Sequence, residues 1–331
     1  MWATKAAFGV VDPETDACLV TNDFPIFRAR ENLLVPKLMS LVFAQSRFQH
    51  TAAALATGTT ERRRLKEDAF LSISVLLPPL SEQRRILDMV TAVDGAILAA
   101  QNELSAAESA SNALVTEILG GVPERSELGQ VAEVTIGRQR SPKHASGPHM
   151  KMYLRAANVK DGKLDLSDVL EMNFEPGEQA TFGLKPGDVL VTEGCGSLSQ
   201  IGASAQWNAE LAGLVCFQNT LLRLRAVPGL TASGYLHHLA RHAFHAGWWS
   251  QIASGTNIFH IGLERAKRLP VPIPEIAAQE AIGETLDAVL DVVDGARHHV
   301  AELRALRTAL LVDLLAGEHV IPDSYDSALS A

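Results

Sequence analysis

Two stretches of this sequence carry the same hydrophobic pattern, and Gln83 in the first corresponds to Gln279 in the second, 196 residues later. The copies align without a gap over residues 75–121 and 271–317. Within each copy the apolar positions alternate steps of four and three residues, which is the period of 3.5 that coiled-coil helices show. Prolines precede each pattern and glycines follow it, as they do at helix ends. The pattern predicts two equivalent long helices.

The repeated apolar positions define one seam on each predicted helix. The first seam consists of Ile86, Val90, Val93, Ile97, Ala100, Leu104, Ala107, Ser111, Leu114 and Ile118. The second consists of Ile282, Leu286, Val289, Val293, Ala296, Val300, Leu303, Arg307, Leu310 and Leu314. Both have a polar break at one matched place, Ser111 or Arg307, and a polar seam residue can set the register of a helix pair. We expect the seams to face each other in an antiparallel coiled coil with a globular domain at either end. The alternative is two unrelated amphipathic helices, each packed on its own domain.

The rest of the chain has the pattern of mixed α+β globular domains. Residues 150–159, 184–194 and 216–226 have the pattern of strands, and residues 231–253 have the period of a helix. The repeat extends upstream more loosely, with 54–60 resembling 251–257 and 17–29 resembling 213–226. Each unit is therefore expected to be a globular portion followed by a long helix.

Composition narrows the class of protein. With 331 residues and a hydrophobic fraction of 47%, the chain has enough apolar material for about two domains. Its three cysteines form no CxxC pair, which argues against a disulfide framework or a zinc site and fits a reducing compartment. The N-terminus has no signal-peptide core, and no apolar run approaches the ~18 residues of a membrane span. We therefore expect a cytoplasmic protein with no membrane partner.

The net charge of −9 comes mainly from the two predicted helices. Residues 82–121 have two Lys/Arg against six Asp/Glu, and residues 271–331 have three against eleven, whereas residues 122–270 have fifteen against thirteen. A protein that reads nucleic acid needs local basic groups and not a basic average. Phosphate would repel the acidic helices, so we expect a protein partner there, or otherwise a solvated face. The candidate partner-binding residues are Glu284, Asp287, Asp291 and Asp294.

The tandem arrangement resembles the specificity subunit of type I restriction–modification systems. The residues that carry the resemblance are Leu77–Ile86 (LPPLSEQRRI), Pro272–Pro274 with Gln279, Lys185–Val191 (KPGDVLV) and Leu310–Glu318 (LLVDLLAGE). The match covers nearly the whole chain. It implies a partial first target recognition domain at 1–80, a first long spacer helix at 81–121, a second target recognition domain at 122–274, a second long spacer helix at 275–318 and a C-terminal tail at 319–331.

The resemblance implies a non-catalytic subunit that reads a bipartite site in double-stranded DNA, one half per recognition domain. The paired helices would act as a spacer and dock methyltransferase subunits, and through them a restriction subunit. S-adenosylmethionine, ATP and Mg²⁺ are expected only in those partner subunits. On this resemblance the first recognition domain is expected to lack its N-terminal half, and a mis-assigned start codon, a decayed gene or a genuinely short form would each account for this. The alternative function is a remnant that binds methyltransferase subunits without full DNA recognition.

Candidate DNA contacts lie in loop-like segments with basic, amide or glycine residues. Arginine can grip a phosphate or read guanine through two hydrogen bonds, and glutamine can read adenine. The candidates in the second domain are Arg138, Gln139, Arg140, Lys143, Tyr153, Arg155, Gly194, Gly196, Ser197, Gln218, Asn219, Thr256, Asn257, Arg265 and Lys267. The matched basic loop of the first domain adds Arg62, Arg63 and Arg64. Ordinary solvated loops or buried structural roles are the alternatives for all of them.

Enzymatic alternatives lack the residues that their chemistry needs. The LPPL motif has neither the preceding amide nor the following aromatic residue of an amino-methyltransferase loop. Asp188 and Glu193 have roughly the spacing of nuclease Mg²⁺ ligands, but no lysine follows them. His238, His242 and His245 have helical spacing and could share a face, but there is no HExxH motif. We predict no catalytic residue and no metal site in this chain, with an independent enzyme as the third alternative.

Overall fold

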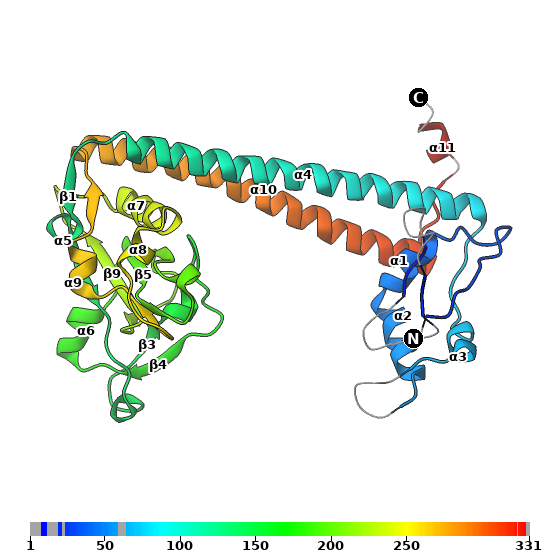
Figure 1. The fold of residues 1–331 in the computed structure, drawn as a ribbon, viewed down its shortest axis with the longest axis horizontal. Helices are drawn as coiled ribbons and strands as arrows, with labels where there is room; N and C mark the ends of the chain where they lie inside the picture. The colour runs from blue at the N-terminus through cyan, green and yellow to red at the C-terminus, as the bar shows by residue number, and fades with distance from the viewer. Residues whose placement is uncertain (1–7, 12–18, 22–23, 59–63, 323, 329–331) are drawn as a thin grey trace. The chain divides into compact units, whose positions relative to one another are not determined.

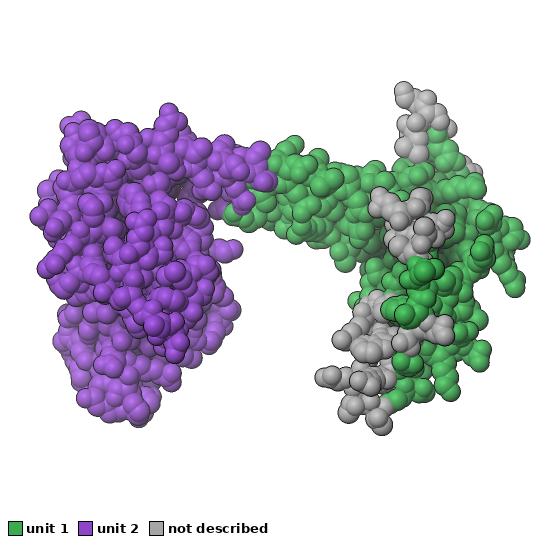
Figure 2. Space-filling view, viewed as in Figure 1, with its two compact units in different colours: residues 1–104, 295–331 green, residues 105–294 purple. Residues whose placement is uncertain are grey.

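A computed structural model describes residues 8–11, 19–21, 24–58, 64–322 and 324–328. The chain forms two compact units, which Figure 2 shows in different colours. Unit 1 contains Met1–Leu104 with Gly295–Ala331, and unit 2 contains Ser105–Asp294. No helix in the described part of the chain is both long and apolar enough to cross a membrane.

The two predicted long helices are present as α4 (Leu80–Gly120) and α10 (Ile276–Ala316), and each contributes one part to each unit (Figure 1). In unit 1, Ile86 near the start of α4 shares a core with Leu314 near the end of α10. In unit 2 the order is reversed, because Leu119 near the end of α4 packs with Ile282 near the start of α10. These contacts confirm antiparallel pairing. All ten seam positions of each helix are buried or half-buried.

The two polar seam positions have different roles. The Ser111 side chain is buried. In unit 1, Arg307 donates from Nε and Nη2 to the carboxylate of Asp94 on the other helix, with Nη2 and Oδ2 3.0 Å apart. This two-point ion pair joins α4 to α10 at one register, because the planar guanidinium fits a carboxylate in one orientation.

The repeated glutamine at each helix entry has the same buried role in both units. Gln83 is 0% exposed, donates to the carbonyls of Leu33 and Pro78 (both 2.8 Å) and accepts from the Val35 N–H (2.8 Å). Buried polar groups need such partners.

Gln279 repeats this set in unit 2 at 1% exposure. It donates to the carbonyls of Leu230 (3.0 Å) and Pro274 (2.8 Å) and accepts from the Ala232 N–H (3.0 Å). The repeated proline–glutamine junction therefore ties the start of each long helix to a loop of its own unit.

The repeat continues through the short helices around each junction. Unit 1 has α1 (Leu38–Ala44), α2 (Ser46–Leu55), a β-bridge between Thr57 and Arg64, and α3 (Glu67–Leu71). Unit 2 has α7 (Ser233–His245), α8 (Trp248–Ile252), a β-bridge between Ser254 and His260, and α9 (Leu263–Lys267). The sequence similarity between residues 54–60 and 251–257 thus reflects one local arrangement that occurs in both units.

Unit 1 is held together by an apolar core under the helix pair. Phe8, Phe43, Phe48 and Phe70 pack their rings together, with centroids 5.2–6.3 Å apart, beside buried Leu38. The C-terminal α11 (Ser324–Ala328) is attached by Asp326, whose carboxylate accepts two hydrogen bonds from Arg85 (2.9 and 2.7 Å).

Unit 2 contains the strands. The main sheet is antiparallel in the order β2 (Ala132–Ile136), β9 (Leu221–Ala226), β5 (Asp188–Thr192), β7 (Ser204–Trp207). A second sheet has the order β4 (Leu170–Asn173), β3 (Met150–Leu154), β8 (Cys216–Phe217). Two short ladders pair β1 (Arg125–Glu127) with β11 (Pro270–Pro272), and β6 (Gly194–Cys195) with β10 (Phe259–His260). The short helices α5 (Leu128–Val131) and α6 (Pro176–Phe182), and the 3₁₀ turns Pro142–His144, Ala156–Asn158 and Leu198–Gln200, complete the unit.

Strand β5 forms the centre of unit 2 because both of its faces are buried. Val189 and Val191 pack with α7, whereas Leu190 points into a second core with Trp207 and Phe217. The strand is followed by Glu193 and the glycine-rich segment, so this core fixes where that loop begins.

Two predicted elements are interrupted. The helix expected over 231–253 is split into α7 and α8, because Gly247 adopts a left-handed conformation with φ +74°. The strand expected over 216–226 is split into β8 and β9, with Gln218–Thr220 between them. In unit 1, the described residues of the similar segment 17–29 form no strand. The described residues of unit 1 include no counterparts of β2 and β5, which pair with β9 in unit 2.

Candidate nucleic-acid interface

Two of the glycine-containing loops selected from the sequence lie side by side in unit 2. The β6–β10 ladder pairs Gly194 with His260 and Cys195 with Phe259. A Cβ on Gly196 would lie 3.8 Å from the carbonyl oxygen of Asn257. The loop that follows Glu193 and the loop from Ser254 to His260 therefore form one continuous edge.

Glu193 holds this edge together. Its carboxylate is almost fully buried, and it bonds the Nδ1 atom of His260 (3.0 Å) and accepts from the N–H of Gly262 (3.2 Å). Its backbone carbonyl accepts from the Ile261 N–H (3.0 Å). The sequence pattern identified Glu193 only as a weak metal-ligand candidate, and its use in positioning the second loop was missed.

The turn between β8 and β9 joins this edge and brings two further candidate segments to it. The Thr220 carbonyl accepts from the Glu193 N–H (2.9 Å), and its hydroxyl accepts from the Ala156 N–H (3.1 Å). The Asn219 N–H donates to the Arg138 carbonyl (3.0 Å). A side chain at Gly137 would meet the Gln218 carbonyl at 2.2 Å, so the segments pack with their backbones in contact. Thr220 was not selected from the sequence, because an isolated threonine in a strand pattern gives no signal.

The structure places Arg138 inside the domain. Its side chain is 6% exposed, Nε donates to Glu178 (2.8 Å), Nη1 donates to the Asn173 carbonyl (2.7 Å), and the guanidinium lies 5.1 Å from the centre of the Phe174 ring. This differs from the expectation of a base-reading side chain, because these groups already occupy much of its hydrogen-bonding capacity. In this structure Arg138 positions the loop that follows it.

The other candidates in the segment that contains Arg138 are accessible to solvent. Gln139, Arg140 and Lys143 are exposed, and Gln218 and Asn219 are half-buried at the adjoining turn. Ser197, Thr256 and Asn257 are exposed along the edge formed by the two glycine-containing loops. These side chains belong to segments far apart in the sequence, and the backbone contacts above join those segments.

Several other candidates are engaged within the domain. Tyr153 is 1% exposed and belongs to a core cluster. Arg155 pairs with Asp168 (2.6 Å), and Lys267 pairs with Glu264 (3.1 Å). Arg265 was expected to contact phosphate. Its side chain instead donates to the carbonyls of Ile261 (2.6 Å) and His260 (2.9 Å), and so it stabilises its own loop.

In unit 1, Arg64 forms the bridge to Thr57 at the position matched by His260 in unit 2. Arg62 and Arg63 lie outside the described residues. The matched loops therefore begin and end alike, as far as the structure describes them.

The residues weighed for metal or catalytic chemistry are dispersed. His238 bonds Asp287 (2.7 Å), His242 packs edge-on against Trp248, and His245 lies 3.0 Å from Asp161. Asp188 is bound by two hydrogen bonds from Arg225, both 2.7 Å. Among the described residues, no group of three or more His, Cys, Asp or Glu side chains could hold a metal ion.

Comparison with known proteins identifies the class to which this arrangement is similar. No family model matches the chain. A solved chain of a type I restriction–modification system, from a study of its complex assembly and conformational transition, matches with a TM-score of 0.62 at 18% identity, over 87% of this chain and 73% of the other. This likeness concerns the fold.

The sequence is similar to two specificity subunits of type I restriction enzymes. It is 25% identical over 170 residues to the StySPI subunit of Salmonella potsdam, covering 50% of this chain and 35% of that protein. It is 24% identical over 191 residues to the EcoKI subunit of Escherichia coli K12, covering 56% and 40%. These matches confirm the resemblance to specificity subunits. The chain matches less than half the length of these relatives.

Proposed function

We propose that this chain is the DNA-specificity component of a type I restriction–modification complex and has no catalytic centre of its own. The observation that carries the proposal is that backbone contacts join five separate segments of unit 2, which carry exposed amide, hydroxyl and basic side chains. In this proposal the partner subunits hold S-adenosylmethionine, ATP and Mg²⁺ and perform methylation and cleavage. The helix pair docks the methyltransferase subunits.

The accessible side chains divide by chemistry into two groups. Amides and arginine form directional hydrogen bonds to base edges, so Gln139, Arg140, Gln218 and Asn219 are proposed to read sequence. Lys143 and the backbone and side chains of Gly194–Ser197 and Thr256–Asn257 are proposed to contact phosphate, which fixes register without reading sequence. Arg138, Arg155, Arg265 and Lys267 support these groups through the internal contacts described above.

The test is the binding of the complex, assembled with its own methyltransferase subunits, to a selected target duplex and to a scrambled duplex. Gln139→Ala should cost about 1–3 kcal/mol on the target and relax preference at one base pair. Lys143→Ala should weaken binding to both duplexes alike and flatten the salt dependence by about one unit. Lys160→Ala, an exposed basic residue outside the five segments, is the matched control. A Gln139 variant with unchanged preference would remove base reading from this loop.

A second function is favoured by one observation in unit 1. The described residues of that unit contain only the helices and one bridge, and none of them belongs to a strand. A chain that docks methyltransferase subunits and reads DNA through unit 2 alone fits this architecture. The two functions differ in the number of base-pair blocks that the complex specifies.

A further inference from the structure

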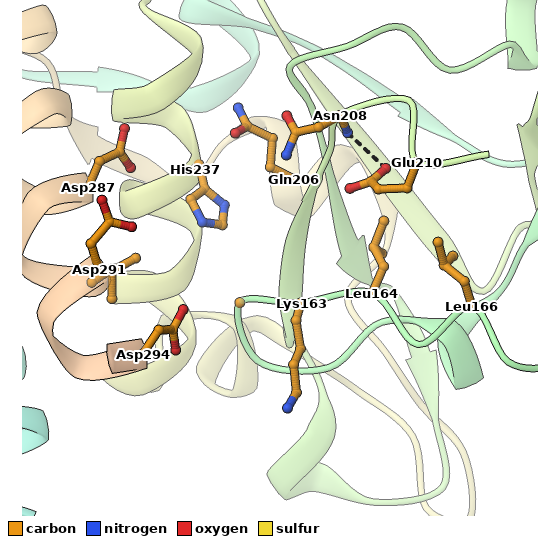
Figure 3. A pocket seen from close by; sticks show the side chains of 12 residues that line it. Lys163, Leu164, Leu166, Gln206, Asn208, Glu210, His237, Asp287, Asp291 and Asp294 are labelled. Carbon is orange, nitrogen blue, oxygen red and sulfur yellow. Dashed lines mark hydrogen bonds between the residues drawn. The ribbon is translucent and has the colours of Figure 1, made fainter. Parts of the chain in front are cut away.

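Unit 2 contains a pocket of about 490 Å³ on the side of α10, which none of the proposed DNA contacts lines. Its walls come from α7, α10, the loop at 162–166 and the segment that includes the end of β7 (Figure 3). Figure 3 shows Asp287, Asp291 and Asp294 along one side of α10, next to His237 of α7.

The pocket is acidic at one wall and apolar at others. Asp287, Asp291 and Asp294 are spaced by four and three residues, so they share a helix face. Glu210 adds a fourth carboxylate, against one cation, Lys163. Leu164, Leu166 and Leu290 line the same space.

His237 gives a second, independent sign that the pocket receives a ligand. Its side chain is 8% exposed, lines the pocket and makes no hydrogen bond to any described residue; its Nδ1 atom is buried without a partner. Burial, followed by the neighbouring charge of His238, lowers the pKa of His237 to about 3, so the ring is neutral at ordinary pH. A buried polar ring without a partner is uncommon, because such groups are nearly always satisfied in folded proteins.

The three aspartates are present on α10 and absent from the matching positions of α4. At the positions that match Asp287, Asp291 and Asp294, the first helix has Thr91, Gly95 and Leu98. A solvated face that only kept a long helix soluble would be equally useful on both copies. The three aspartates therefore belong to the copy of the helix that lines this pocket.

The side chains that line the pocket indicate the chemistry of its ligand. The carboxylates favour a cation, and the leucines favour an aliphatic stem. Arginine has both, and its planar guanidinium bonds carboxylates at two points, whereas a lysine ammonium is a single compact charge. Asp287 is already bonded by His238, and Asp291 has no such bond to a described residue, so Asp291 is the carboxylate best placed to receive a new cation.

We propose that this pocket binds an arginine side chain of the methyltransferase subunit, with its guanidinium at Asp291 and its stem against the leucines. The inference rests on the proposed function, since it names how that partner is held. In this proposal the part of α10 that lies in unit 2 and the loops beside it form one docking surface.

The test measures affinity between the full chain and the methyltransferase subunit, with DNA binding by the chain measured in parallel. Asp291→Asn and Asp291→Lys should weaken partner binding about tenfold or more, with the larger loss for lysine, because a desolvated charge pair is broken. Glu280→Gln removes an exposed charge from the same helix outside the pocket and should leave the affinity within about twofold. Melting temperatures of the variants should not fall, since each removes repulsion among carboxylates.

A charge swap identifies the partner residue. Each arginine of the methyltransferase subunit is replaced by glutamate and paired with Asp291→Arg, and one pair should restore binding. Wild-type affinity for the Asp291→Lys variant, or the absence of any restoring pair, would overturn the inference while leaving the proposed function intact. Failure of the wild-type chain to bind any methyltransferase subunit would overturn both.

Discussion

Replacing Gln279 with methionine keeps the side-chain volume and removes the three hydrogen bonds that the Gln279 side chain makes at the entry to α10. The Ala232 N–H and the carbonyls of Leu230 and Pro274 lose their partner inside a site where Gln279 is 1% exposed. At about 1 kcal/mol for each lost bond, unit 2 should lose about 3 kcal/mol of stability. For a unit of this size that corresponds to a fall of roughly 6–12 °C in melting temperature.

Hydrogen exchange followed by mass spectrometry assigns the effect to one unit. In the Gln279→Met variant the amide of Ala232 should exchange faster, while the amide of Val35 in unit 1 keeps its protection. Gln83→Met should produce the reverse pattern, because Gln83 makes the same set of bonds in unit 1. Gln251→Met, at an exposed position on α8, is the matched control. Equal melting temperatures for Gln279→Met and Gln251→Met would refute the role of the buried glutamine.

Three further outcomes follow from burial. Leu104→Asp with Val300→Asp should strongly destabilise the chain in thermal unfolding, because both positions lie in the helix seams and an unpaired charge there is costly; an unchanged midpoint would count against the seam. Arg138→Ala should lower urea stability by about 2–3 kcal/mol through loss of its bonds to Glu178 and the Asn173 carbonyl, whereas a surface role would leave stability unchanged. Burial raises the pKa of the Cys216 thiol to about 12, so it should resist alkylation at pH 8 until the chain unfolds; rapid labelling of the native chain would contradict this.

The parts of the fold that the sequence predicted best are those with a long repeat. Each long helix has ten seam positions at a fixed period. That period predicts a helix, and burial of all ten positions requires the two helices to pair along their seams. The ends of short elements are governed by single residues, and the left-handed Gly247 that divides α7 from α8 could not be distinguished by pattern from a glycine inside a helix.

The candidate interface was predicted in its segments but not in the roles of its side chains. Loops with glycine and polar residues were found from composition, and the backbone contacts at Gly137 and Thr220 that gather them depend on tertiary packing. Arginine looks the same in a sequence whether it faces solvent or a buried carboxylate. Arg138 was therefore assigned to base reading, although Glu178, 40 residues later, binds it inside the domain. No sequence pattern links Glu178, which lies in α6, to the loop that contains Arg138.

The most direct measurement of the central claim is selection from a pool of random duplexes by the complex of this chain with its methyltransferase subunits, followed by sequencing of the bound DNA. We predict enrichment of a defined sequence in two blocks separated by unspecified base pairs. One enriched block would assign reading to unit 2 alone. Retention of DNA without any enriched sequence would contradict the claim that this chain specifies a target.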